Sequence, residues 1–275
     1  MAAPVGRIGA WVLMACCLLP AIPGLAAPPA TTGFDPDRAL QESQASLGRT
    51  LSGYEFRDAS LRPLTLSEFR GRPLLINLVY TSCAFACPLV IETLADSIDI
   101  ARDAVGGDSF QVLTVGFDTR MDTPERMREF AANHGIRDEG WRFASAEPET
   151  IARLSKDLGF LFVPSAKGFD HIAQTTVVDA DGVIYRQVYG AMFDPPFLVE
   201  PLKDLVFGRE SVPTSYEGLI NRIRLFCTIY DPWSGRYRFD YSPFIGIAVG
   251  VGALGTLGFV VARGWLRHHR RRPRT

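Results

Sequence analysis

Two cysteines four residues apart are the residues in this sequence best suited to chemistry. Cys83 and Cys87 belong to the stretch CAFACP, which follows the apolar run 74–80 almost directly. They therefore fall where a buried strand is expected to end and a helix to begin. Backbone N–H groups and the helix dipole at such a junction favour a thiolate, and a four-residue separation brings both sulfurs to one helical face. The pair predicts a dithiol site. Metal binding, disulfide formation and plain burial at a helix start are its three interpretations.

A metal at this pair needs a further ligand from elsewhere in the chain. Thiolates select Cu(I), zinc or iron–sulfur clusters, and a third, borderline ligand also makes Cu(II) accessible. Of the four histidines, His268 and His269 lie in a basic tail. His134 closes an expected surface helix, where the helix dipole ordinarily accounts for a histidine. His171 remains, just before an expected strand, with Asp170 as a candidate partner for its ring.

Strands and helices alternate around these residues. Strands are expected at 74–80, 110–117, 141–144, 175–179 and 183–189, and helices at 38–47, 88–105, 123–134, 148–158 and 196–207. Thr123 fits a helix cap, Gly159 closes a helix, and the stretch ADG at 180–182 is a hairpin signal. This order of elements predicts an α/β sandwich of thioredoxin-like type.

Both ends of the chain are apolar and carry arginine but no acid. Residues 1–27 have the early base, apolar run and small residues of a secretory signal, with a cleavage site near 24–26. An uncleaved anchor is the alternative, and the stretch LMAC also loosely resembles a lipoprotein signal. Residues 244–262 are uncharged and, at about 1.5 Å per residue, long enough to cross a bilayer. A buried core helix is the alternative for this run.

The charge distribution sets the expected topology. The net charge is −1, but residues 28–243 alone carry −8, because the only charged residues at the two ends are arginines, one in 1–27 and six in 244–275. Cationic flanks stay cytoplasmic, so the tail is expected inside and the acidic part on the exported side of a bacterial-type inner membrane. The basic tail is then a topology signal rather than a nucleic-acid patch, and no nucleic-acid partner is expected.

The expected organisation has six parts. They are a signal at 1–27, a linker with a short helix at 28–52, a thioredoxin-like domain at 53–210, a juxtamembrane segment at 211–243, a transmembrane helix at 244–262 and a cytoplasmic tail at 263–275. Of the five cysteines, Cys16 and Cys17 belong to the signal, and Cys227 lies outside the domain. Cys227 is either a spare thiol or a redox partner for the pair.

Three motifs in order resemble the Sco/SenC family. They are LVYTSCAFACP at 78–88, VGFDTRMDTP at 115–124, and the Asp170-His171 dipeptide followed by a strand and DADG at 179–182. The resemblance covers roughly residues 53–207. It implies a thioredoxin-like fold and copper, as Cu(I), Cu(II) or both, held by Cys83, Cys87 and His171. It also implies a chaperone that helps to metallate the copper-site subunit of cytochrome c oxidase, with a thiol reductant or another copper chaperone as a further partner.

The sequence departs from the family pattern in two respects. Ala84 and Ala86 stand where many members have a proline and an acidic residue, and the apolar span is C-terminal where the usual anchor is N-terminal. The resemblance also places Asp118 in the neighbourhood of the site, although an aspartate at a strand end or turn has an ordinary structural role.

Two enzymatic alternatives remain beside the chaperone. In a thiol–disulfide oxidoreductase acting on oxidase or other exported cysteines, Cys83 would attack and Cys87 would resolve the mixed disulfide, without any need for His171. A peroxidase would instead need one activated cysteine with an arginine such as Arg120 beside it.

Overall fold

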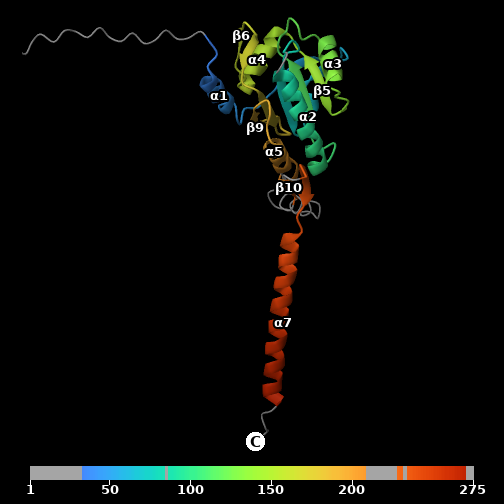
Figure 1. Cartoon of the computed structure of the whole chain (residues 1–275), viewed down its shortest axis with the longest axis vertical. Helices are drawn as coiled ribbons and strands as arrows, with labels where there is room; N and C mark the ends of the chain where they lie inside the picture. The colour runs from blue at the N-terminus through green and yellow to red at the C-terminus, as the bar shows by residue number, and fades with distance from the viewer. Residues whose placement is uncertain (1–32, 84–85, 209–227, 232–233, 271–275) are drawn as a thin grey trace, which may run out of the picture. The chain divides into compact units, whose positions relative to one another are not determined.

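The computed structural model describes residues 33–83, 86–208, 228–231 and 234–270 (Figure 1). The predicted signal, Cys227 and residues 271–275 lie outside the described residues. The chain divides into two compact units, Met1–Gly33 and Phe34–Thr275. The second unit contains the sheet, the helices and the predicted site.

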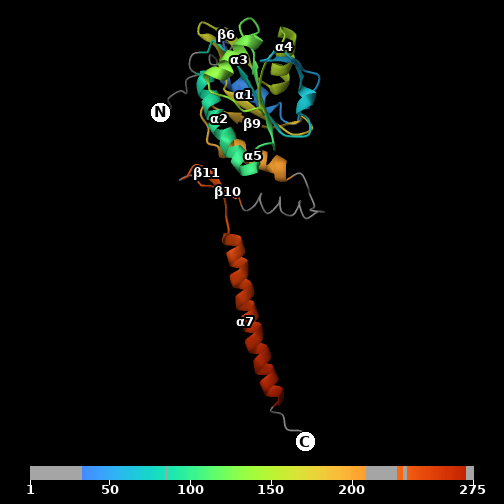
Figure 2. The same cartoon turned by 90° about the vertical axis from the view of Figure 1, so that its right-hand side faces the viewer.

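Within the described part of the chain, seven strands form one mixed sheet in the order β2-β1-β5-β4-β3-β8-β9. Helices lie beside these strands (Figure 2). The strands are β1 (Glu55–Asp58), β2 (Pro63–Thr65), β3 (Leu74–Val79), β4 (Gln111–Gly116), β5 (Trp141–Ser145), β8 (Gln174–Val178) and β9 (Ile184–Tyr189). Strands β3, β4 and β5 are parallel, and the other pairings are antiparallel. Every residue of β3 is buried, which explains why this strand reads as an unbroken apolar run.

Helices and two further hairpins complete the described structure. The helices are α1 (Pro36–Gln44), the 3-10 helix η1 (Leu66–Phe69), α2 (Ala86–Val105), α3 (Pro124–Asn133), α4 (Pro148–Leu158), α5 (Pro196–Phe207) and α7 (Ser242–Arg270). The hairpins pair β6 (Phe162–Ser165) with β7 (Gly168–His171), and β10 (Thr228–Asp231) with β11 (Arg236–Phe239). The mixed α/β, thioredoxin-like architecture predicted from the sequence is confirmed.

The helix ends follow local chemistry. Thr123 caps α3, accepting the backbone N–H of Arg126 at 3.3 Å, and α4 ends at Gly159 with a φ of 65°. Helix α1 begins earlier than the expected range, because Asp35 accepts the N–H groups of Asp37 and Arg38 and so caps it.

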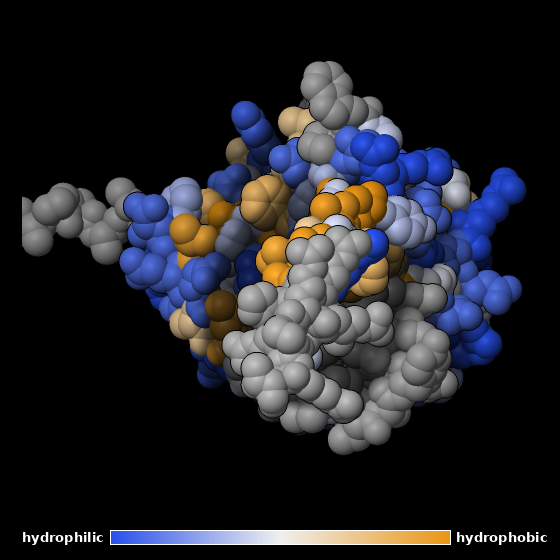
Figure 3. Space-filling model, turned by 90° about the horizontal axis from the view of Figure 1, so that it is seen from below, coloured by the Kyte–Doolittle hydropathy of each residue, from blue (hydrophilic) through white to orange (hydrophobic). Residues whose placement is uncertain are grey.

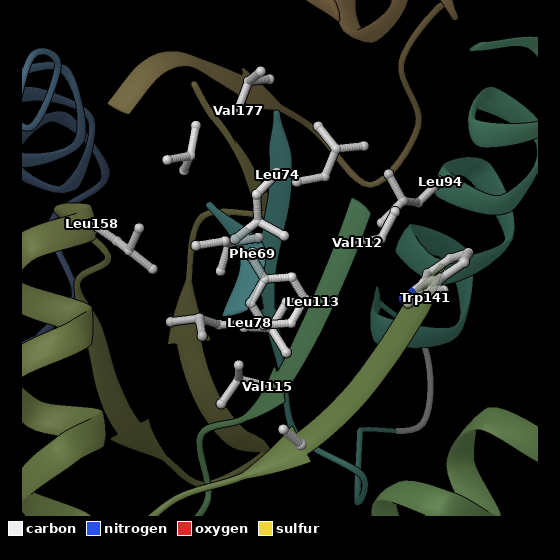
Figure 4. Packing of buried hydrophobic residues seen from close by; sticks show 14 of the residues in the cluster. Phe69, Leu74, Leu78, Leu94, Val112, Leu113, Val115, Trp141, Leu158 and Val177 are labelled. Carbon is white, nitrogen blue, oxygen red and sulfur yellow. The ribbon is translucent and has the colours of Figure 1, made fainter. Parts of the chain in front are cut away.

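The core lies between the sheet and its helices (Figure 4). In this view Leu94 of α2 and Leu158 of α4 lie on opposite sides of the central strands, with Leu113 of β4 between them. All three side chains are at most 1% exposed. On the surface seen from below, exposed hydrophobic residues lie near the middle of the view, with hydrophilic residues to the left and right of them (Figure 3). Because the strands are packed on both faces, the loops at their ends have fixed supports.

The C-terminal helix α7 is long and apolar enough to cross a membrane. Its segment Ser242–Arg263 has 22 residues and a mean hydropathy of 2.2, and none of its apolar stretch is buried against the rest of the described chain. A core helix would bury its apolar side chains, so the exposure of this window argues against the buried-helix alternative. Length and composition thus agree with the predicted span at 244–262.

Candidate functional site

Strand β3 and helix α2 position the two cysteines. The strand ends at Val79, the backbone N–H of Cys83 closes a turn on the carbonyl of Tyr80 at 3.1 Å, and α2 begins at Ala86. The backbone N–H of Cys87 points at the Cys83 sulfur, with 3.3 Å from nitrogen to sulfur. The pair therefore lies at the expected strand-to-helix junction, and one N–H group of the first turn, that of Cys87, faces the Cys83 sulfur.

The two thiols differ in environment. Cys87 is 2% exposed, whereas Cys83 is half-buried, and no disulfide joins them in the structure. Burial raises the pKa of the Cys87 thiol, the neighbouring Cys83 raises it further, and a backbone N–H from Tyr80 opposes the rise. Cys83 is thus the accessible sulfur, and Cys87 is the sulfur that resists ionisation until a cation or another partner replaces the lost solvation.

His171 is the last residue of β7 and pairs with Phe162 of β6. Its Nδ1 lies 2.9 Å from the backbone carbonyl oxygen of Ile172. A carbonyl can only accept, so Nδ1 carries the proton and Nε2 keeps the lone pair. Burial lowers the pKa of the ring, although the Ile172 carbonyl and Asp170 act in the opposite direction. The imidazole is thereby held in the neutral form that binds metals.

The hydrogen-bond partner of the His171 ring is not Asp170, the candidate that the sequence offered, but the backbone carbonyl of Ile172. The exposed Asp170 influences His171 only through its charge, and the hydrogen bond comes from the adjacent Ile172 carbonyl. Position in sequence favoured the carboxylate, but neighbouring side chains on a strand point to opposite faces. His134, which the sequence assigns to a helix end rather than to a metal site, behaves as expected. It is the C-cap of α3, and its Nδ1 lies 2.7 Å from the Phe130 carbonyl oxygen.

Aromatic rings surround the imidazole. The His171 ring centroid lies 5.2 Å from that of Phe160, 5.6 Å from that of Phe117 and 6.1 Å from that of Tyr80. This environment excludes water from one side of the ring and explains the direction of its pKa shift. The sequence analysis did not predict that these aromatic residues surround His171. The only sequence feature they share is that each lies just beyond the end of a strand or helix.

A buried carboxylate fixes the loop that leads to the cysteines. Asp122 is 2% exposed. Its Oδ1 accepts both the backbone N–H and the hydroxyl of Thr81 at 2.8 Å, and its Oδ2 accepts the Asp118 N–H at 2.8 Å. Burial raises the pKa of Asp122 while the Thr81 contacts oppose that shift. The sequence pointed to Asp118, yet Asp122 is the residue that ties the β4–α3 loop to the cysteine loop.

The arrangement of donors fits copper only in part. Two sulfurs and a neutral imidazole nitrogen suit copper chemically. Among the residues that the structure describes, however, no group of three His, Cys, Asp or Glu side chains is close enough together to hold a metal ion. The structure brings Cys83 and Cys87 together but does not group His171 with them; the His171 ring instead meets the Tyr80 ring edge-on. The ligand trio stays a prediction, and it requires His171 and the two cysteines to come closer together.

The SCO1/SenC family profile matches residues 42–206. The chain belongs to the SCO1/SenC family. A curated Sco relative, the SCO1 protein homolog of Bacillus subtilis (strain 168), is 19% identical over 161 residues, which cover 56% of this chain and 81% of the relative.

Two solved structures with TM-scores above 0.5 give the same result for the fold. A protein from Aquifex aeolicus VF5 is 26% identical with a TM-score of 0.54, covering 62% of this chain and 99% of that chain. BsSco, a member of the Sco family of cytochrome c oxidase assembly proteins, is 16% identical with a TM-score of 0.53 and covers 58% of this chain and 95% of its own. A third structure, ScoI of Bradyrhizobium japonicum with copper bound, is 21% identical with a TM-score of 0.46. The match covers 58% of this chain and 97% of that chain.

Proposed function

We propose that this Sco protein is a membrane-tethered copper chaperone that delivers copper to the copper-site subunit of a cytochrome c oxidase. The observation that carries the proposal is the pairing of Cys83 and Cys87 at the strand-to-helix junction, where the Cys87 N–H points at the Cys83 sulfur, in a chain of the SCO1/SenC family. The neutral form of His171, with Nε2 available, supports it. Copper is cargo here, so the site must both hold it and release it. Cys83 and Cys87 supply soft sulfur ligands, and Nε2 of His171 supplies the third donor.

Loading this site displaces protons. Metal ligands of the thiol type bind as thiolates, so copper binding releases their protons and weakens as the pH falls. The half-buried Cys83 is the ligand that an acceptor group reaches first, because Cys87 is closed off by the core. Transfer then proceeds by ligand exchange: an acceptor ligand binds copper as Cys83 dissociates, and Cys87 dissociates last.

The tether supports a location at a membrane surface. Helix α7 meets the length and composition of a span, and arginines follow it. Under the rule that cationic flanks stay cytoplasmic, the Sco domain faces the exported side, where an oxidase copper domain would be reached. Its acidic character suits contact with a basic patch on that acceptor.

A thiol–disulfide oxidoreductase is the second candidate, and the asymmetry of the thiols favours it. An accessible Cys83 would attack a target disulfide, and the buried Cys87 would then resolve the mixed disulfide by forming a bond to Cys83. This activity needs both cysteines but not His171. The two functions also exclude each other in time, since copper binds only the reduced pair.

One titration separates these candidates. The full chain, purified in detergent with its thiols reduced, is titrated with Cu(I) and Cu(II), and loaded protein is then mixed with an apo oxidase copper domain. We expect one copper per chain and transfer to the acceptor. Cys83→Ser and Cys87→Ser should abolish binding, and His171→Ala should weaken it, whereas His134→Ala is the matched control.

The outcomes have distinct meanings. Unchanged affinity for both copper states in His171→Ala removes the third-ligand assignment. Binding without transfer removes the delivery function. Disulfide reduction that survives His171→Ala, with no copper transfer by the wild type, favours the oxidoreductase.

A further inference from the structure

The β10–β11 hairpin lies directly ahead of the apolar helix α7. Strand β11 ends at Phe239, and α7 begins at Ser242. Asp240 ties the two together, because its Oδ1 accepts the backbone N–H of Ser242 at 2.9 Å. The SCO1/SenC profile ends at residue 206, so the hairpin lies beyond the part of the chain that the family accounts for.

A buried cation holds the hairpin on the domain. Lys203 of α5 is 2% exposed, and its Nζ donates to the Thr228 carbonyl oxygen and lies 3.3 Å from both carboxylate oxygens of Glu200. The same Nζ lies 5.0 Å from the centre of the Tyr237 ring, and the Tyr237 hydroxyl donates to Glu200 at 2.7 Å. Both strands of the hairpin are thus bound to α5 (Figure 2).

Basic side chains project from the other face of the hairpin, whereas its acid is covered. Ile229 pairs with Arg238 in the hairpin register, and Asp231 is likewise opposite Arg236. Because side chains alternate along a strand, these residues share the face that Tyr237 does not occupy. Arg236 is exposed and the Arg238 side chain is 70% exposed, but that of Asp231 is only 10% exposed. We call this the outer face.

The ion pair on the outer face leaves capacity for a further anion. Arg238 lies 2.7 Å from Asp231, whose carboxylate also accepts the Ser234 hydroxyl at 2.8 Å. A guanidinium carries five N–H donors, so Arg238 keeps Asp231 and still has donors directed to solvent. Together with Arg236, it gives the outer face a net positive charge.

The hairpin also lies where the charge of the chain changes sign. Residues 28–208 hold 26 acidic and 17 basic residues, whereas residues 209–243 hold four acidic and five basic residues. An anionic bilayer surface repels the first part and attracts exposed arginines within about 8 Å at physiological salt. Ile229 is 49% exposed and Tyr241 is 66% exposed, and a tyrosine beside a span is typical of a membrane interface.

We propose that the outer face of the β10–β11 hairpin binds anionic lipid headgroups, with Arg236 and Arg238 on the lipid phosphates. Continuity with α7 brings this face to the bilayer surface, and its charge selects the lipid. Because Lys203 and Tyr237 bind the hairpin to α5, headgroup binding also holds the Sco domain close to the membrane. This inference rests on the membrane tether of the proposed function and deepens it.

The test measures amide hydrogen exchange of strands β10 and β11 in the full chain, reconstituted in nanodiscs. One set of nanodiscs contains only phosphatidylcholine, and the other also contains phosphatidylglycerol. A ligand that binds the folded hairpin suppresses its opening, and each arginine near an anionic surface contributes roughly a fivefold factor. We therefore expect exchange to be at least about fivefold slower with the anionic lipid, and about 0.5 M salt should remove the difference.

Two variants assign the effect to the arginines. Arg236→Gln, which leaves the ion pair of Arg238 in place, should reduce the ratio between the two lipids, and the double variant with Arg238→Gln should abolish it. Wild type and Arg236→Gln should exchange alike in phosphatidylcholine, because the contacts with α5 are unchanged. Arg137→Gln is the matched control, since Arg137 is an exposed arginine of the α3–β5 loop, and it should leave the ratio as in the wild type.

Equal exchange of the wild-type hairpin in both kinds of nanodisc would overturn the proposal. A lipid effect that persists undiminished in the double variant would overturn it as well. Incorporation into nanodiscs tests the tether separately. A chain that stays outside them would contradict the tether, and its sedimentation with phosphatidylglycerol vesicles but not with phosphatidylcholine vesicles would still support the headgroup contact.

Discussion

At the scale of single residues, the sequence identifies candidate metal donors but not the differences between their environments. Spacing singles out Cys83 and Cys87, and elimination singles out His171, because donor chemistry is written in residue types. The difference in reactivity between the Cys83 and Cys87 thiols depends on how deeply each is buried, and burial is a property of the fold. Asp122 and Thr81 lie 41 residues apart in the chain, so no local pattern could join them.

The unequal burial of the cysteines predicts unequal reactivity. In the reduced, copper-free protein, iodoacetamide should modify Cys83 at least about tenfold faster than Cys87, since the thiolate is the reacting form. The raised pKa of Cys87 means that its modification should increase as the pH rises above 8. Mass spectrometry of the separated peptides measures both rates. In denaturant the two rates should converge, and equal rates in the folded protein would contradict the assignment.

At the scale of elements, the long helices and buried strands follow from periodicity and capping, whereas the short strands do not. Thr123 and Gly159 mark helix ends by local chemistry that needs no tertiary context. Strands β1, β2, β6 and β7 have three or four residues each, which is too short for an alternating pattern to stand out. The hairpin that carries His171 was therefore missed even though the histidine was found.

The end of α4 provides a prediction at this scale. Gly159 has a φ of +65°, and a Cβ there would stand 2.7 Å from the Ser43 Cα of α1. Gly159→Ala should lower the free energy of unfolding by about 3 kcal/mol, through left-handed strain and overpacking. Gly107→Ala is the control, because nothing lies within 4 Å of its added Cβ. Chemical denaturation measures both, and equal effects would refute the packing argument.

Asp58 joins the β1–β2 hairpin to β5 and predicts a pH dependence. Its side chain is 3% exposed and lies 2.7 Å from Arg142 and 3.0 Å from Arg62. Burial alone would raise its pKa, but hydrogen bonds from Arg62, Ser60 and Arg142 lower it overall. A lowered folded-state pKa gives stability that is complete above the unfolded value of about 3.9 and is lost as the pH falls towards the folded value.

The corresponding measurement is denaturation of Asp58→Asn as a function of pH. At pH 7 the variant should be less stable than the wild type by about 2 kcal/mol. Below about pH 4 the difference should shrink, because the Asp58 carboxyl of the unfolded wild type is then protonated while the folded form is not, which favours unfolding. The exposed Asp99 of α2 offers the matched control, Asp99→Asn, which should change little at either pH. A difference that grew on acidification would contradict the sign.

At the scale of the whole molecule, the near-zero net charge results from an acidic segment at residues 28–243 and two basic ends. The family profile covers residues 42–206 and leaves the apolar helix α7 outside it. Composition was sufficient to find this helix, because crossing a bilayer requires length and apolarity rather than specific contacts. Which side each end occupies follows from charge alone, so it stays a prediction.

Reporter fusions to the full chain test the orientation. Alkaline phosphatase fused after Thr275 should be inactive and green fluorescent protein fused there should fluoresce, because the arginine-rich end stays inside. Fusion of the phosphatase after Phe239, ahead of α7, should give an active enzyme. An active phosphatase at Thr275 would reverse the orientation.

The bond between the His171 ring and the adjacent Ile172 carbonyl has a consequence for the speed of metal exchange. Because the imidazole takes its orientation from the very next residue, the ring moves with its strand and keeps its aim during any hairpin displacement. The rotational entropy of the side chain is then lost during folding rather than at capture. If His171 ligates copper as proposed, the metal meets a donor that is already oriented, and its exchange needs no search among the rotamers of this side chain.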